Sequence, residues 1–266
     1  MTKEGAGMKK FFFLSFCFII FNNLSVNSAT LQANVSKEGS LGVHRIVDAE
    51  TNIPIQGAKV TLPQKNYGAT TDENGTFNLN ADITGSTILS VEKDGYRPFS
   101  LTINEKIASK PMIVGIEKNN SMNLTIDKEM FHLGDNNYSE QSANASQFRV
   151  NCVGPFYTKK VKIDYANDNT YLVIGSIIGI DTKMARSMGQ NNITYAYASP
   201  PEVFFNGSKI AEIQLNGDGQ RIKIPKNLIK LHQNNEITIK TGRNLMQTAY
   251  IDYDDIEFMN LSIETN

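Results

Sequence analysis

Carboxylates crowd the segment that precedes the last apolar run of the chain, at Asp252, Asp254, Asp255 and Glu257. Like charges at this spacing repel one another unless a positive charge lies among them. Because Ca²⁺ prefers oxygen ligands, we expect a structural calcium ion held by Asp252, Asp254 and Asp255, with Asp135 as a further ligand. The spacing does not match an EF-hand loop. The alternative is an exposed acidic turn that protects an edge strand from pairing.

A second set of side chains suits sugar recognition, in which an aromatic ring stacks on the sugar and planar polar groups hold its hydroxyls. The candidates lie in loops or at strand ends of the second half of the chain: Tyr138, Tyr157, Tyr195, Tyr197 and Arg243. Tyr195 and Tyr197 share a face, so they either line a groove or belong to the core. The chain has no tryptophan, which weighs against a strong stacking platform.

Residues arranged for catalysis are few. His44, His132 and His232 are far apart, and none belongs to a metal-ligand doublet. There is no Gly-x-Ser-x-Gly elbow and no glycine-rich phosphate loop. Cys152 lies in an apolar run and is expected to be a buried core thiol. We therefore expect no enzyme, although the carboxylate pair of a glycoside hydrolase needs no local motif.

The elements that must position these residues are strands. Short runs of alternating apolar and polar residues fill both halves of the chain, and no segment has a convincing helical period. Asn74-Gly75 and Asn206-Gly207 each lie between such runs and predict hairpin turns. The apolar run 172–180 predicts a fully buried central strand with a glycine kink. The stretch 181–192 has no clear pattern and is either a long functional loop or disordered.

One part of the first half has a family resemblance. Pro54-Ile55-Gln56-Gly57-Ala58-Lys59-Val60 is followed by Thr71-Asp72-Glu73-Asn74-Gly75-Thr76-Phe77 and by Asp94-Gly95-Tyr96. In this order and spacing, the segments resemble the carboxypeptidase regulatory-like domain, a small β-sandwich of transthyretin-like type, placed here at residues 38–118. The resemblance implies an accessory module that does no chemistry and acts as a spacer or docking module.

The second half resembles another family. Val203-Phe204-Phe205-Asn206-Gly207, Ile222-Lys223-Ile224-Pro225 and Asn234-Asn235-Glu236-Ile237 are followed by the acidic segment 252–258. These pieces resemble the C-terminal half of galactose-binding-like jelly rolls, the fold of many carbohydrate-binding modules, placed here at residues 120–266. The resemblance implies glycan binding and favours a calcium ion near the last strand. We therefore expect an all-β protein of two β-sandwich domains, the second a larger jelly roll.

Residues 1–33 have the organisation of a secretory signal peptide, with Met8-Lys9-Lys10, an apolar core at 11–21 and a polar exit. The core is too short for a stable membrane span, so we expect no span after cleavage and a secreted, periplasmic or cell-surface location. An uncleaved anchor is the alternative. The formal net charge of −1 gives no support to a nucleic-acid partner.

These patterns predict a non-catalytic exported protein whose second domain binds a polysaccharide or other glycan. The first alternative is a surface or periplasmic protein-interaction or adhesion module, whose partner is a surface protein. The second alternative is an unrecognised hydrolase. A flat apolar surface without a groove would favour protein interaction, and two facing carboxylates in a cleft would favour hydrolysis.

Overall fold

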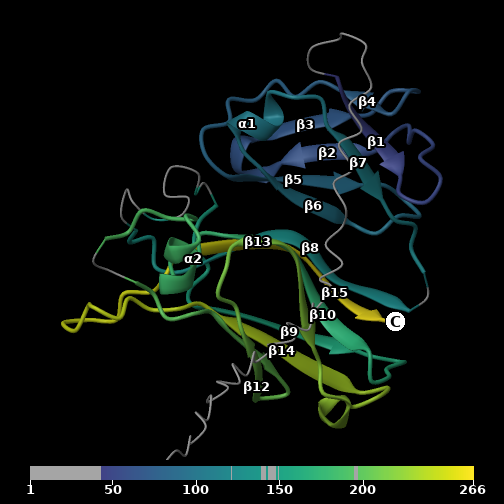
Figure 1. Cartoon of the computed structure of the whole chain (residues 1–266). Helices are drawn as coiled ribbons and strands as arrows, with labels where there is room; N and C mark the ends of the chain where they lie inside the picture. The colour runs from purple at the N-terminus through teal and green to yellow at the C-terminus, as the bar shows by residue number, and fades with distance from the viewer. Residues whose placement is uncertain (1–42, 121, 139–141, 143–147, 149, 195–196) are drawn as a thin grey trace, which may run out of the picture.

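The computed structural model describes residues 43–120, 122–138, 142, 148, 150–194 and 197–266 (Figure 1). These residues form an all-β protein with two sandwiches, as the alternating pattern predicts. The predicted signal peptide and Tyr195 lie outside the described residues. No helix in the described part of the chain is both long enough and apolar enough to cross a membrane.

The first sandwich is made of two sheets that share an apolar core. One sheet has the order β4–β1–β7, with strands β4 (Thr76–Phe77), β1 (His44–Asp48) and β7 (Ile113–Ile116). The other has the order β3–β2–β5–β6, with strands β3 (Tyr67–Thr70), β2 (Lys59–Leu62), β5 (Thr87–Glu92) and β6 (Phe99–Ile103). Two short helices, η1 (Pro63–Lys65) and α1 (Glu105–Ala108), connect strands. Every second residue of β2 is buried, which is why the period-two pattern is visible in the sequence.

Asn74-Gly75 forms a tight turn, but the prediction of a hairpin is wrong. The strands on either side, β3 and β4, belong to different sheets. Asp72 holds the turn, because its Oδ1 accepts hydrogen bonds from the N–H groups of Asn74 and Thr76 at 2.9 and 2.8 Å. A Cβ on Gly75 would lie 2.5 Å from the Ile46 carbonyl oxygen. The Asn-Gly pair therefore specifies a turn, while packing decides which strands it joins.

The second sandwich has eight strands within the described residues. They are β8 (Asn123–Leu133), β9 (Phe156–Lys162), β10 (Thr170–Ile178), β11 (Glu202–Phe205), β12 (Ser208–Glu212), β13 (Gly217–Lys223), β14 (Asn234–Lys240) and β15 (Ile256–Thr265). All pairings are antiparallel, in the orders β13–β10–β15–β8 and β12–β11–β14–β9. Successive strands alternate between the sheets, except for the β11–β12 hairpin. This is the strand order of an eight-stranded jelly roll.

Three local predictions for the second sandwich can be compared with the structure. The two-residue hairpin at Asn206-Gly207 is confirmed, with φ values of 49° and 80° as a type I′ turn requires. The central position of the 172–180 run is confirmed, since β10 lies between β13 and β15. The stretch 181–192 contains a short helix, α2 (Lys183–Ser187), which begins where the Thr182 hydroxyl accepts the Ala185 N–H. A five-residue helix is too short to leave a periodic pattern in the sequence.

The outer face of β5 and β6 packs against the sheet that contains β10 and β15 (Figure 1). Ile88 of the first sandwich forms a small apolar cluster with Ile178 and Met259 of the second. Gly175 in β10 makes this approach possible, because a Cβ there would lie 2.6 Å from the Ser100 Oγ. The two sandwiches therefore share a buried interface.

Hydrogen bonds to acidic side chains also link the two sandwiches. Glu264 on β15 accepts hydrogen bonds from Arg97 of the first sandwich and from Arg221 of the second. Asp218 accepts from the backbone N–H and the hydroxyl of Thr102, at 2.9 and 2.7 Å. The interface thus fixes the first sandwich against the second with charged hydrogen bonds as well as apolar contacts.

Buried Glu257 accepts a hydrogen bond from a neutral side chain across the interface. Gln64 in η1 donates a hydrogen bond to Glu257, while the Gln64 amide oxygen accepts the Ile88 N–H at 3.0 Å. Glu257 therefore belongs to the interface between the sandwiches and not to an acidic cluster with Asp252. The alternative of an exposed acidic turn at an edge strand is wrong, since Asp254 and Asp255 are buried and β15 is an inner strand.

Candidate functional site

A pocket of about 230 Å³ lies at one end of the second sandwich. The strand register explains its position: Leu133 at the end of β8 pairs with Ile256 at the start of β15, and Ile178 at the end of β10 pairs with Glu257. The loop after β8, the loop after β10 and the segment before β15 therefore meet at the same end of the sheet. These loops bring four carboxylates to the pocket wall, from Asp181, Asp252, Asp254 and Asp255.

Asp255 is the most enclosed of these carboxylates, with 2% of the residue exposed. Its Oδ1 accepts the Asn136 N–H at 2.9 Å and lies 2.7 Å from His132 Nε2. Its Oδ2 has no hydrogen-bond partner among the described residues. A Cβ on Gly134 would overlap the Asp255 carboxylate, and a Cβ on Gly179 would lie 2.5 Å from the Asp255 carbonyl oxygen. Two glycines therefore let the backbone close around this side chain.

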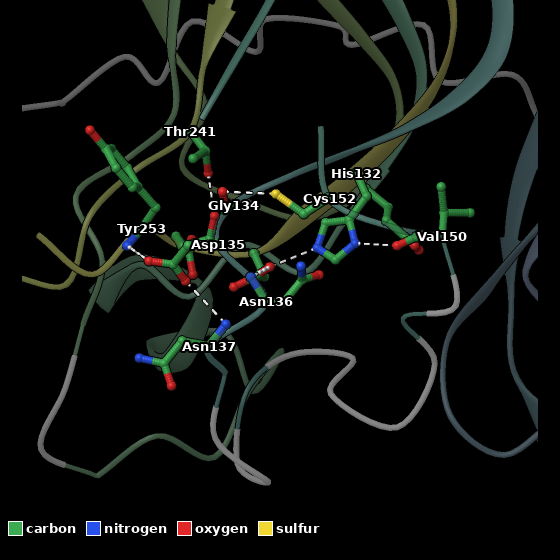
Figure 2. A network of polar contacts seen from close by, with 12 residues as sticks. His132, Gly134, Asp135, Asn136, Asn137, Val150, Cys152, Thr241 and Tyr253 are labelled. Atoms are coloured by element: carbon green, nitrogen blue, oxygen red, sulfur yellow. Dashed lines mark hydrogen bonds and ion pairs between the residues drawn. The ribbon is translucent and has the colours of Figure 1, made fainter. Parts of the chain in front are cut away.

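His132 links the pocket to the segment that follows Phe148. The Val150 carbonyl oxygen lies 2.6 Å from Nδ1 of His132, so that nitrogen donates a hydrogen bond (Figure 2). Burial lowers the pKa of His132, but the hydrogen bonds to Asp255 and Val150 and the nearby carboxylates outweigh burial and raise it above its ordinary value. The ring of Phe148 stacks on His132 at 4.8 Å. His132 is thus a fixed support behind Asp255.

Cys152 supports the same loop from the other side. Its thiol donates a hydrogen bond to the Gly134 carbonyl oxygen, with a sulfur–oxygen distance of 2.9 Å (Figure 2). Burial raises the pKa of the thiol. Cys152 is half-buried and lies outside the strands, so the prediction of a buried core thiol is wrong. The thiol therefore holds the Gly134 turn that packs against Asp255.

Asp252 lies at the rim of the pocket between two side-chain amides. Its Oδ1 accepts from Asn137 Nδ2, and its Oδ2 accepts from Asn244 Nδ2, both at 2.9 Å. Asp135 lies nearby and is exposed, and its two oxygens accept the backbone N–H groups of Asn137 and Tyr253 (Figure 2). Carboxylates and amides at the rim are thereby locked in position by one another.

Asp254 and Asp181 form the floor of the pocket. Asp254 Oδ2 accepts the Asp181 backbone N–H at 3.1 Å. Burial raises the pKa of Asp254 well above its ordinary value, and the neighbouring carboxylates of Asp181, Asp255 and Asp252 raise it further. The Thr241 hydroxyl donates to the Asp254 carbonyl oxygen at 2.6 Å, which fixes the backbone at this point. The floor therefore concentrates acidic groups that repel one another.

Aromatic rings complete the pocket wall, from Tyr138, Tyr197 and Tyr253. Tyr138 stands edge-on to Phe148, with ring centres 4.9 Å apart. The Tyr197 hydroxyl accepts a hydrogen bond from Arg186 at 2.9 Å, and the Arg186 guanidinium lies over the same ring. These contacts hold the rings in place next to the carboxylates.

The structure therefore brings together Tyr138, Tyr197, Asp252, Asp254 and Asp255, which the sequence singled out, and places Asp135 beside them. It places Tyr157 elsewhere. Tyr157 is buried in the core of the second sandwich, edge-on to Phe258, where its hydroxyl donates to Asp127. Strand β9 turns this ring inward, so it cannot meet a ligand in the pocket. Arg243 is exposed and is not part of the pocket wall, although the neighbouring Asn244 is.

Sequence reasoning missed Asp181, Tyr253 and the support from His132. Asp181 follows directly on the buried run 172–180, so its place at a strand end was a usable signal. Tyr253 lies between two of the aspartates that were singled out. His132 had no local signal, because its partners Val150 and Asp255 come from other parts of the chain.

No group of three or more histidine, cysteine, aspartate or glutamate side chains is arranged to hold a metal ion within the described ranges. Both oxygens of Asp135 and of Asp252 accept hydrogen bonds from N–H groups of the protein. The calcium ion expected from the acidic segment stays a prediction.

Comparison with protein families bears on the first sandwich. The family model of the CarboxypepD_reg-like domain matches residues 45–126, which contain most of β1 and all of β2 to β7. The resemblance identified in the first half of the sequence is confirmed. A search of curated proteins finds no match. The matched range ends within β8, so the pocket lies in a part of the chain to which the family match does not extend.

Proposed function

We propose that the protein is a non-catalytic carbohydrate-binding protein and that the pocket of the second sandwich recognises a glycan. The observation that supports this function is the juxtaposition of tyrosine rings with fixed carboxylates and amides in one pocket. A sugar presents an apolar ring face and several hydroxyls, which these two kinds of group match. The jelly-roll strand order supports the resemblance to galactose-binding-like modules.

The hydrogen bonds within the pocket support recognition of a ligand by a preformed site. Asp252 holds Asn137 and Asn244, and Asp255 holds His132 and Asn136. Side chains that are fixed in this way lose little conformational entropy when a ligand binds. The pocket is therefore organised before the ligand arrives.

The first sandwich fits the role of a docking module held rigidly to the second. Carboxypeptidase regulatory-like domains are accessory modules, and this one is fixed to the jelly roll by the pairs at Glu264, Asp218 and Glu257. In this proposal, residues 1–33 direct the protein out of the cytoplasm, and the glycan lies outside the cell or in the periplasm. The first sandwich sets the orientation of the pocket relative to whatever it docks on.

The experiment is a thermal melt followed by calorimetric titration with a panel of soluble polysaccharides, with and without calcium. A ligand that binds only the native state raises the melting temperature. We expect Asp252→Asn to lose glycan binding, because an amide cannot accept from both Asn137 and Asn244. Asp168→Asn, at an exposed site before β10 and so at the other end of the sheet, is the matched control. No shift with any glycan would contradict the proposal.

Exposed apolar side chains beside the pocket favour protein interaction as a second candidate function. Asn244 and Asp252 are joined by two hydrogen bonds, which close a loop between them. The apolar residues of this loop are exposed: Leu245, Met246, Tyr250 and Ile251. If this loop is the functional surface, Met246→Ser with Ile251→Ser abolishes attachment to intact cells while Asp252→Asn does not.

Hydrolysis requires a separate measurement because a carboxyl group with a raised pKa can act as a general acid. Asp254 has such a pKa and shares the pocket with Asp252. To test for hydrolysis, the protein is incubated for a long time with each polysaccharide that it binds, and newly formed reducing ends are measured. We expect none above the level of Asp254→Asn, and a clear excess would assign the pocket to catalysis.

A further inference from the structure

All the charged residues among the described residues that line the pocket are acidic. Its wall contains Asp181, Asp252, Asp254 and Asp255, and no lysine or arginine is among the described residues that line it. The nearest basic groups are already engaged: His132 pairs with Oδ1 of Asp255 at 2.7 Å, and Arg186 donates to the Thr194 carbonyl oxygen and the Tyr197 hydroxyl. A ligand in this pocket therefore meets a wall in which negative charge predominates.

One buried oxygen in the pocket has an unmet hydrogen-bonding capacity. Asp255 Oδ1 accepts two hydrogen bonds, whereas Oδ2 has no partner in the described part of the chain. Leaving a buried charged acceptor unpaired costs a protein more than leaving a neutral one unpaired. Asp255 is one of the residues that line the pocket, so a donor on a bound ligand is the candidate partner for this oxygen.

We infer that the preferred ligand carries a positively charged amino group, so that among glycans the pocket selects those with free amino sugars. This inference rests on the proposed glycan-binding function. A primary ammonium has three donors and no acceptor, which suits a pocket of acceptors. Hydrogen bonds between an ammonium and a carboxylate are about twice as strong as neutral ones.

The aromatic wall supports the same ligand. A cation near the face of a tyrosine ring is attracted by the ring quadrupole, and the pocket has Tyr138, Tyr197 and Tyr253 in its wall. Repulsion among the carboxylates also contributes to the raised pKa of Asp254, and a bound cation would relieve that repulsion. An acidic sugar would add a like charge, so the pocket rejects it.

In this inference the pocket suits an ammonium group better than a metal ion. No group of three or more metal-ligating side chains meets within the residues that the structure places. Asp252 is occupied by two amides, whereas Asp255 offers an oxygen without a partner in the described ranges. An ammonium needs one strong acceptor and tolerates the others at longer range, whereas Ca²⁺ needs about six to eight oxygens.

The test is calorimetric titration with three hexasaccharides of equal length, made of glucosamine, N-acetylglucosamine or galacturonic acid. At pH 6, we expect the glucosamine hexasaccharide to bind about tenfold more tightly than the acetylated one, as one hydrogen bond between charged groups provides. We expect no binding of the acidic hexasaccharide. Added salt should weaken binding of the glucosamine ligand alone.

Two variants assign the selectivity to Asp255. Asp255→Asn should lower the affinity for the glucosamine ligand far more than the affinity for the acetylated one, and so remove the preference. Asp181→Asn provides a second readout if Asp255→Asn fails to fold, because it also lowers the negative charge of the pocket wall and should reduce the preference. Asp168→Asn, which lies outside the pocket, should preserve the preference for the glucosamine ligand.

The outcomes separate the two proposals. Equal affinity for the glucosamine and acetylated ligands, with loss of both in Asp252→Asn, overturns the inference and leaves glycan binding intact. Absence of binding for every glycan overturns the proposed function itself. Calcium is also added to the complex with the glucosamine ligand at an equimolar concentration. If calcium displaces this ligand with a similar affinity, the pocket is assigned to a metal ion and the inference is overturned.

Discussion

Buried carboxylates occur in two regions of this molecule, and the two regions differ in the partners that the carboxylate oxygens have. At the interface between the sandwiches, both oxygens of Glu264 are paired with guanidinium groups, from Arg97 and Arg221. In the pocket, Asp255 is paired with His132 through Oδ1, and its Oδ2 has no hydrogen-bond partner among the described residues. Both acidic residues belong to one segment at the end of the chain. The comparison indicates that an oxygen without a partner, and not burial alone, distinguishes a carboxylate available to a ligand.

Glycines mark both regions, again for different purposes. Gly175 allows one sandwich to approach the other, since a Cβ would lie 2.6 Å from the Oγ of Ser100 in the first sandwich. Gly134 and Gly179 have φ values of 150° and 93° and let loops close around Asp255. At the interface, glycine provides space between two folded parts. At the pocket, it provides backbone conformations that other residues rarely adopt.

The strongest test of the comparison is the loss of a paired carboxylate. Glu264→Ala leaves Arg97 and Arg221 without their shared partner in a partly buried place. We expect a loss of about 3 kcal/mol in the free energy of unfolding, because the remaining charges stay desolvated. Differential scanning calorimetry measures this loss. We also expect the single transition to separate into two as the interface weakens.

Glu129→Ala is the control for this variant, because Glu129 is exposed on β8. A surface change of this kind should alter stability by no more than about 0.5 kcal/mol. If Glu264→Ala were as mild as the control, the ion pairs across the interface would not stabilise the arrangement of the sandwiches.

The second test fills the space that Gly175 leaves. In Gly175→Ala, the new Cβ would collide with Ser100 in β6 and with Asn260 in β15. We expect a loss of about 2 kcal/mol, typical of overpacking in a well-packed region. Gly68→Ala is the matched control, since Gly68 also lies in a strand but its nearest neighbour is the Thr61 Cγ2 atom at 4.0 Å. Equal melting temperatures for the two variants would show that the sandwiches can move apart at no cost.

Local patterns predicted the strands and turns better than the contacts between distant parts. The alternation in β2 and the Asn206-Gly207 turn depend on neighbours within a few residues, so the sequence shows them directly. The acidic segment marked one wall of the pocket for the same reason. The interface was not predictable, because Gln64 and Glu257 are separated by 193 positions and neither belongs to a motif. The sequence likewise grouped Glu257 with Asp255, whereas Asp255 lies in the loop before β15 and contacts His132, and Glu257 lies within β15 and contacts Gln64.

The third test concerns the pocket alone and has the smallest expected effect. The pKa of Asp254 is raised in the folded protein, first by burial and then by Asp181, Asp255 and Asp252. A folded pKa above the unfolded value means that stability is complete at about pH 4 and below, and is lost as pH rises toward the folded pKa. A side-chain amide at this position cannot ionise. Asp254→Asn should therefore be more stable than the wild type by about 1 kcal/mol at pH 8, and equal to it at pH 4.

Denaturant unfolding of the ligand-free proteins at pH 4, 6 and 8 measures this difference. His132 has a raised pKa as well, so its contribution also falls as pH rises above about 6.5. That contribution is present in both proteins and cancels in the comparison. Asp168→Asn should show no such pH-dependent gain, because Asp168 is exposed. A constant difference between Asp254→Asn and the wild type at all three pH values would mean that the pocket does not hold uncompensated acid, and the contrast with the paired interface would fail.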